Sequence, residues 1–308
     1  MKLGFLTACF QATALEEIVR WAGANGFRTL ELSSSPMAPG GRRGNQFDVV
    51  HLDSGRAAAF KSLCTEAGIE VSCLTYCDNP LAASAERRQA VHKHLRKVID
   101  AAALIGTRNV STFVGRNEEK SVRDSAIEGI DVFRELLAYA ADKGVRIAIE
   151  NWPGVGVAGE GLIGNIFASP MIWEQMFEAL PVDNFGLNFD PSHLYWQGID
   201  YLQAARTFAE RIFHVHVKDT EVFSNRVSSY GTIQPGNRWY RYRIPGFGAI
   251  DWAQFVSVLA EGGYDGPLST EHEDPVWSGT DDKVKAGLIL GRKYLSTFVA
   301  DVAGHLPA

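Results

Sequence analysis

The feature that most constrains this sequence is a regular alternation of strand-like and helix-like segments along its whole length. Short apolar runs predict strands, and each is followed by a longer segment whose apolar residues have helical spacing. The predicted strands cover residues 3–7, 27–32, 70–75, 109–114, 145–150, 185–190, 211–217 and 267–271. The predicted helices cover residues 14–25, 56–67, 84–105, 121–143, 170–180, 201–208, 251–261 and 281–299.

Strands separated by helices predict parallel pairing, because a parallel connection needs a crossover. Eight β-then-α units without a break in composition predict one α/β domain over residues 1–308, a closed (β/α)8 TIM barrel. An open, doubly wound sheet is the alternative. The first predicted βα turn lacks the G-x-G-x-x-G fingerprint, which removes the commonest reason to expect that sheet.

Composition narrows the functional classes. The chain has 308 residues, 46% hydrophobic and 21% charged, and a net charge of −6. A negative net charge argues against nucleic-acid binding by phosphate neutralisation, and no apolar run approaches the roughly 18 residues of a membrane span. The N-terminus is expected to be a first strand and not a signal peptide. Four cysteines without C-x-x-C spacing favour free thiols, and we expect a cytoplasmic protein.

The late predicted strands all end in residues that can bind a metal. The carboxyl ends of four successive strands carry Glu150, Asp190, His216 and Glu271. Side chains alternate along a strand, so each of these residues shares a face with the residue two positions earlier. If that face points inward, the four side chains converge at the C-terminal mouth of the barrel, where active sites of this fold lie.

Three carboxylates that meet in one place need compensation, because burial and mutual repulsion would otherwise raise their pKa values. A divalent cation supplies it. Three oxygen ligands and one imidazole suit Mn²⁺, Mg²⁺, Co²⁺ or Fe²⁺ better than a closed structural zinc site, which prefers thiolates. We therefore predict one divalent metal ion, with Mn²⁺ first and Zn²⁺ also allowed, bound by Glu150, Asp190, His216 and Glu271.

The sequence resembles a known family, the sugar phosphate isomerase/epimerase superfamily of xylose-isomerase-like TIM barrels. The resemblance covers nearly the whole chain. It rests on five blocks: Ile149-Glu150-Asn151, Phe189-Asp190-Pro191-Ser192-His193, His214-Val215-His216-Val217-Lys218-Asp219, Pro245-Gly246-Phe247-Gly248 with Asp251-Trp252, and Glu271-His272-Glu273. By this likeness the four strand-end residues correspond to the family's metal ligands, and His193 to a histidine that contacts substrate.

The resemblance implies a metal-dependent isomerase or epimerase of a ketose, keto-sugar or inosose. In such chemistry a metal on the carbonyl and the adjacent hydroxyl stabilises the enediolate formed when the carbon between them loses a proton. One ligand glutamate removes the proton and the other returns one, so Glu150, Glu271 and His193 are the candidate catalytic residues. The expected partner is a small carbohydrate or polyol, with no nucleic acid and no membrane; a homo-oligomer or a partner subunit stays open.

The sequence also departs from the family pattern. Ketose 3-epimerases of this group carry an arginine shortly after the histidine of strand seven, whereas here no arginine occurs until Arg226. A dehydratase, or a lyase that eliminates a glycosyl group from a 3-oxo-glycoside, therefore stays open, with His193 as its acid or base. Endonuclease IV-like phosphodiester cleavage would need further histidines, for which His51, His92 and His94 are available. A catalytically inactive binding module is disfavoured by the four intact ligands.

Two βα connections, residues 151–169 and 218–250, are too long for plain turns and are predicted to overhang the barrel mouth. In the first, Trp152 and Glu160 are candidate substrate contacts. In the second, Arg238-Trp239-Tyr240-Arg241-Tyr242-Arg243 alternates aromatic and cationic residues. Such a run either binds a sugar and its substituents, through Trp239 and Arg241, or forms a hairpin that packs its aromatics. Lys218 shares the inward face of His216 and is a further candidate.

Overall fold

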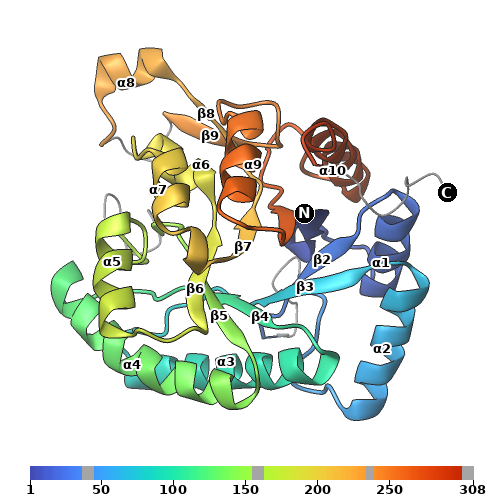
Figure 1. The fold of residues 1–308 in the computed structure, drawn as a ribbon, viewed down its shortest axis with the longest axis horizontal. Coiled ribbons are helices and arrows are strands. Elements are labelled where there is room, and N and C mark those ends of the chain that lie inside the picture. The colour runs from blue at the N-terminus through green and yellow to red at the C-terminus, as the bar shows by residue number, and fades with distance from the viewer. Residues whose placement is uncertain (37–44, 155–162, 234–238, 300–308) are drawn as a thin grey trace.

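The computed structural model describes residues 1–36, 45–154, 163–233 and 239–299. Eight parallel strands close into a barrel in the order β1-β10-β7-β6-β5-β4-β3-β2 (Figure 1). The barrel strands are β1 (Lys2–Leu6), β2 (Thr29–Ser33), β3 (Glu70–Thr75), β4 (Asn109–Thr112), β5 (Arg146–Glu150), β6 (Phe185–Phe189), β7 (Ile212–His216) and β10 (Pro267–Thr270). The predicted TIM barrel is confirmed, and the open sheet is excluded.

Helices surround the barrel and connect its strands. They are α1 (Leu15–Ala24), α2 (Ser54–Glu66), α3 (Ala85–Ile105), α4 (Val122–Asp142), α5 (Pro170–Ala179), α7 (Tyr201–Thr207), α9 (Trp252–Glu261) and α10 (Asp281–Leu295). Polar side chains cap many of their N-termini; Ser84, for example, accepts a hydrogen bond from the backbone N–H of Arg87. Gly106 ends α3 with φ of +86°, a left-handed conformation that glycine adopts without strain.

Several short helices were not expected from the sequence. Two short 3₁₀ helices occur, η1 (Thr7–Cys9) and η2 (Ala209–Arg211). The helix α6 (Pro191–Trp196) follows β6 without a turn, because Pro191 suits the first helical position and the Asp190 carboxylate caps the helix. The long connection after β7 contains β8 (Asp219–Val222), α8 (Ser224–Tyr230) and β9 (Tyr240–Arg243).

The strands β8 and β9 form an antiparallel hairpin, which is one of the two alternatives that the sequence left open. It lies beside α6 and α9 in Figure 1. The buried carboxylate of Asp219 fastens its base by accepting hydrogen bonds from the backbone N–H groups of Gly246 and Ile250 and from the indole N–H of Trp252. Gly248 passes so close to Asp219 that a Cβ atom there would lie 2.2 Å from its Oδ1.

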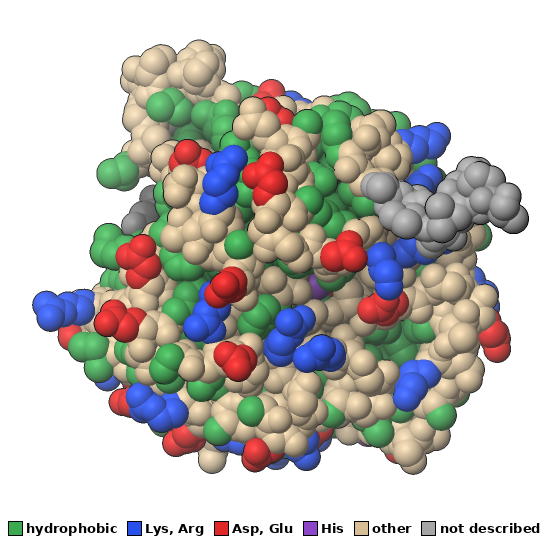
Figure 2. Space-filling model, viewed as in Figure 1, with side chains coloured by type: hydrophobic (Ala, Val, Ile, Leu, Met, Phe, Trp, Pro, Cys, Tyr) green, Lys and Arg blue, Asp and Glu red, His purple; other side chains and the backbone are tan. Residues whose placement is uncertain are grey.

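Charged side chains of both signs are mixed on one face of the molecule. On the face that Figure 2 shows, Lys and Arg side chains are interspersed with Asp and Glu, and no broad basic area forms. Within the described ranges, none of the helices is both long enough and apolar enough to cross a bilayer.

Candidate metal centre

Three of the four predicted ligands, Glu150, Asp190 and Glu271, converge with His193 at the C-terminal end of the barrel, and the fourth, His216, lies beside Glu150 and Glu271. The Nδ1 atom of His216 lies 3.1 Å from Oε2 of Glu271 and 3.7 Å from Oε1 of Glu150. His193, on α6, places Nε2 at 3.4 Å from Oδ2 of Asp190 and at 3.5 Å from Oε1 of Glu150. Glu150, Asp190, His193 and Glu271 can each offer one ligand atom, all within 4.8 Å of one another.

Three polar atoms at this place are buried and have no hydrogen-bond partner among the described residues. They are Oδ2 of Asp190, Nε2 of His193 and Nδ1 of His216. Two of them have close ion-pair contacts, Asp190 Oδ2 with Lys218 at 3.2 Å and His216 Nδ1 with Glu271 at 3.1 Å, but none is fully satisfied, and such atoms suit a bound ligand. The donor set is rich in carboxylate oxygen and includes imidazole nitrogen, which fits a divalent cation.

The electrostatics agree with this fit. Burial and the charge of Glu271 raise the pKa of Glu150 to about 7. Burial also raises the pKa of Asp190, although Lys218 lowers it in part. Burial lowers the pKa of the His216 imidazole, but Glu31 and Glu271 together raise it well above its ordinary value. Burial thus favours protonation of two of these carboxylates, and a cation that binds here would compete with protons for their oxygens.

Lys218 lies beside the same carboxylates. Its Nζ is 2.5 Å from Glu271 Oε2, 3.0 Å from Glu273 Oε2 and 3.2 Å from Asp190 Oδ2. Although burial raises the pKa of Glu271, Lys218 and His216 hold it well below its usual range. Sequence reasoning placed Lys218 here but omitted Glu273. The signal for Glu273 was its position two residues after Glu271, which gives it the same face if the extended chain continues.

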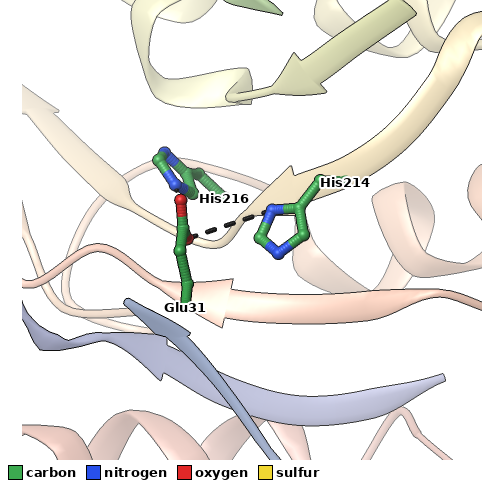
Figure 3. Close-up of side chains that lie close together, drawn as sticks. All are labelled: Glu31, His214 and His216. Carbon is green, nitrogen blue, oxygen red and sulfur yellow. Dashed lines mark hydrogen bonds and ion pairs between the residues drawn. The ribbon is translucent and has the colours of Figure 1, made fainter. Parts of the chain in front are cut away.

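Glu31 was also missed by sequence reasoning. It lies on β2 in the barrel interior and points toward His214 and His216 of β7 (Figure 3). Its carboxylate accepts hydrogen bonds from Nε2 of His216 at 2.9 Å and from Oγ of Ser269 at 2.7 Å. Further donors are the hydroxyl of Thr75 and, at 3.5 Å, the side-chain amide of Asn188. The only sequence signal was one carboxylate inside an apolar strand, Leu30-Glu31-Leu32.

Glu31 holds the imidazole of His216 in a defined orientation. Burial raises the pKa of Glu31, but the charges of His216 and His214 lower it by a larger amount, and the resulting pKa is about 2. This carboxylate is therefore ionised. With Nε2–H of His216 donating to Glu31, Nδ1 faces the predicted ligands. Carboxylates that orient metal-binding histidines in this way are a common feature of metal sites. His214 lies deeper and bonds to Ser72 and Asn188, so its nitrogens already have partners.

Replacing Glu31 with glutamine is expected to weaken Mn²⁺ binding about 10- to 100-fold. Four side-chain donors converge on the Glu31 carboxylate. The glutamine amide would instead present N–H groups to some of these donors. The bond that orients His216 would then be lost or reversed. Titration calorimetry with Mn²⁺ measures the effect. Glu70→Gln, an exposed carboxylate at the other end of the barrel, is the matched control. Equal affinity in the two variants would show that Glu31 has no role in metal binding.

A pocket of about 320 Å³ opens onto the metal centre. Its wall includes Glu150, Glu271, Lys218 and Trp152, all of which the sequence analysis proposed. The Trp152 ring lies 5.3 Å from that of Phe113, and together they give the pocket an apolar side. The described lining also contains Leu6, Ala8, Ser33, Ser35, Thr75, Cys77, Tyr242 and Glu273. A cavity of about 460 Å³ at the opposite end of the barrel contains none of the predicted ligands.

The other predicted substrate contacts lie elsewhere. Trp239 is buried against Trp196, with ring centroids 5.7 Å apart. The Nε–H of Arg241 donates to Glu221 at 2.7 Å. Neither Trp239 nor Arg241 belongs to the described pocket lining, and their substrate contacts stay predictions. Glu160 lies outside the described residues.

The additional histidines that an endonuclease-like site would need do not join this centre. His51 contacts the carboxylate of Asp48. The Nε2 atoms of His92 and His94 face the backbone carbonyls of Pro80 and Ser34 at 2.8 Å and 2.7 Å. Each of these three side chains therefore has a local structural partner.

Comparisons with known proteins agree with the fold. Residues 19–294 match the family described as the xylose isomerase-like TIM barrel. The uncharacterized protein YfiH of Bacillus subtilis (strain 168) is 26% identical over 297 residues, which are 89% of this chain and 93% of YfiH. An inosose dehydratase of Clostridium botulinum (strain Alaska E43 / Type E3) is 30% identical over 144 residues, 46% of this chain and 45% of that enzyme.

The chain thus matches less than half the length of that dehydratase. Among solved structures, the IOLI protein with a bound zinc atom superposes with a TM-score of 0.72 and 18% identity, over 97% of this chain and 100% of that one. At this identity the structural likeness supports the fold alone.

Proposed function

The chain belongs to the xylose isomerase-like TIM barrel family, and on that premise we propose that it is a divalent-metal-dependent isomerase or epimerase of a ketose, keto-sugar or inosose. The observation that supports this proposal most is the convergence of buried ligand atoms beside a pocket of about 320 Å³. We propose Glu150, Asp190, His216 and Glu271 as the ligands. Mn²⁺ is the expected ion because the set is mainly carboxylate oxygen, and the zinc of the IOLI structure supports a divalent metal in this family.

The bound metal would supply Lewis-acid polarisation of a substrate carbonyl and its neighbouring hydroxyl. The protein side chains move the protons. Glu150 on β5 and Glu271 after β10 reach the pocket from different sides, because β6 and β7 separate these strands in the barrel. One carboxylate can therefore remove the proton next to the carbonyl while the other returns a proton to the opposite face or to the neighbouring oxygen. Trp152 and Phe113 exclude water from one side of the substrate.

A dehydratase is the second candidate, and two observations favour it. One relative that matches part of this chain is an inosose dehydratase. In addition, His193 places Nε2 near Glu150, where it could protonate a departing oxygen on the carbon next to the abstracted proton. A lyase that expels a glycosyl group from a 3-oxo-glycoside would use the same residues. We also propose a cytoplasmic location, because all four cysteines are free thiols.

Solvent deuterium exchange tests this proposal before any product is identified. The protein is incubated in D₂O with ketoses, inososes and 3-oxo-glycosides, with Mn²⁺ or with EDTA. We expect Mn²⁺-dependent deuterium incorporation next to the carbonyl of at least one compound. Mass spectrometry of the products then separates an isomer from a dehydrated or cleaved product. Incorporation that is equal with Mn²⁺ and EDTA, or no incorporation across all three classes, would contradict the proposal.

A further inference from the structure

The end of the barrel opposite the metal centre has a cavity of its own. Its volume is about 460 Å³, which lies in the range of small-molecule sites. Its wall includes the first residues of six barrel strands, Lys2, Thr29, Glu70, Asn109, Arg146 and Pro267. The cavity therefore lies at the N-terminal ends of the strands, whereas the predicted metal ligands lie at their C-terminal ends.

Arg146 brings a positive charge to this cavity without a carboxylate to neutralise it. Its Nε and Nη2 atoms donate to Oδ1 of Asn109 at 3.1 and 2.8 Å, and its guanidinium lies 4.3 Å from the centre of the Phe213 ring. Within the described ranges, Nη1 of Arg146 has no hydrogen-bond partner, and no acidic side chain forms an ion pair with this residue. Burial, and to a lesser extent the like charge of Arg108, lower the pKa of Arg146, so a bound anion would be favourable here.

The charged residues around Arg146 leave an excess of positive charge. The two acidic side chains of the wall already have partners, because Glu70 pairs with Lys2 at 2.5 Å and Asp265 pairs with the N-terminal ammonium group. Arg108 and Lys61 also line the cavity, and both are exposed. In the part of the chain that the structure describes, neither forms an ion pair. Three cationic side chains thus surround the cavity without acidic partners.

Two buried hydroxyl groups on the same wall also lack partners. Thr29 and Thr107 are 2% and 6% exposed, and the Oγ1 atom of each has no hydrogen-bond partner among the described residues. Gly4 leaves the space that the Thr29 hydroxyl occupies, because a Cβ atom at Gly4 would lie 2.1 Å from it. Buried hydroxyls of this kind suit the oxygen atoms of a bound ligand.

We propose that this cavity binds a small phosphate-bearing molecule, with Arg146 and Arg108 as its main cationic contacts. A guanidinium can donate two parallel hydrogen bonds to a phosphate group, and three cations without acidic partners favour a dianion over a carboxylate. Phe60, Ile69 and Ile105 add apolar surface to the wall, where a small organic part of the ligand could pack. This inference does not depend on the function proposed above.

Calorimetric titration with inorganic phosphate and with glycerol 3-phosphate tests the inference. The full chain is first dialysed free of metal ions, so that phosphate cannot bind through a metal at the barrel mouth. Acetate at the same ionic strength is the control anion. We expect a Kd for phosphate of about 1 mM or tighter, and acetate binding at least about tenfold weaker. Tighter binding of glycerol 3-phosphate would identify the ligand as an ester, and equal affinity would identify it as inorganic phosphate.

Substitutions at the cavity locate the binding site. Arg108→Gln changes an exposed residue, so the variant should fold, and it should lower phosphate affinity about tenfold or more through loss of a charge-assisted hydrogen bond. Arg146→Gln should have a similar effect, and its melting temperature is measured because Arg146 also bonds to Asn109. Arg123→Gln is the matched control, since Arg123 is exposed at the start of α4 and outside the cavity wall.

Three results would overturn this inference. They are the absence of phosphate binding at about 10 mM, equal affinity for phosphate and acetate, and equal phosphate affinity in Arg108→Gln and Arg123→Gln. None of them would affect Mn²⁺-dependent deuterium exchange, on which the proposed function depends. The two proposals can therefore fail separately.

Discussion

Replacing Asp190 with alanine should lower Mn²⁺ affinity at least about 100-fold, because one of the four proposed ligands is lost. The loss is not expected to unfold the barrel. The Asp190 backbone stays bonded to the side chain of Asn151, whose oxygen accepts its N–H and whose amide donates to its carbonyl. Elemental analysis after dialysis and titration calorimetry measure the effect.

Asp190 has a second role that the experiment must separate from metal binding. Its Oδ1 accepts the backbone N–H of Ser192 and caps α6, and loss of such a cap costs about 1 kcal/mol. Asp190→Asn keeps a capping oxygen but removes the charge, so it serves as the matched variant. Both variants should lose tight Mn²⁺ binding, and only Asp190→Ala should lose stability. Full metal occupancy in both would rule out Asp190 as a ligand.

Glutamine at position 150 or at position 271 should lower turnover about 10²- to 10⁴-fold, the usual size of a lost general acid or base. For a two-base epimerase, each single substitution should stop net epimerisation yet permit slow deuterium exchange on one face. For an elimination, one glutamate should be needed for exchange, and His193→Ala should lose product by a similar factor while exchange continues. The assay is the deuterium experiment described above, with product analysis.

An amide can still bind a metal weakly, so metal occupancy must be measured in each Glu→Gln variant before rates are compared. Should both variants keep the metal and near-native rates, these glutamates serve only to hold the ion. Deuterium exchange without product indicates that one proton transfer is lost. The absence of both exchange and product, in a variant without metal, indicates that the metal is lost. This pair of variants thus also distinguishes the isomerase from the dehydratase.

The fold could be predicted because each strand and helix shows its own hydrophobic periodicity in the sequence. Side-chain alternation places Glu150, Asp190 and His216 on inward faces. The short helices that were missed lack such a signal. The helix α6 has only six residues, too few to show a helical repeat. Aromatic and cationic residues alternate in the β9 strand, so a hairpin was one of two alternatives. This alternation did not indicate which side chains face the pocket.

The contacts around the centre depend on distant pairs. Glu31 and His216 are 185 residues apart, and nothing near Glu31 in the sequence indicates its partner. The hairpin gives a similar case: Arg241 and Arg243 both turn to Glu221, whereas Tyr242, between them, turns to His193. Sequence reasoning favoured the residues with the most conspicuous chemistry, Trp239 and Arg241. Closure of the barrel and the register of the hairpin bring Glu31 and Tyr242 to the site.

One divalent metal is proposed to bind at the C-terminal mouth of the barrel, and anomalous diffraction from crystals grown with Mn²⁺ would locate it. We predict a single strong anomalous peak within coordination distance of Glu150, Asp190, His216 and Glu271. No peak there at saturating Mn²⁺, or a peak at another position such as the Glu31–His214 cluster of the barrel interior, would contradict the account.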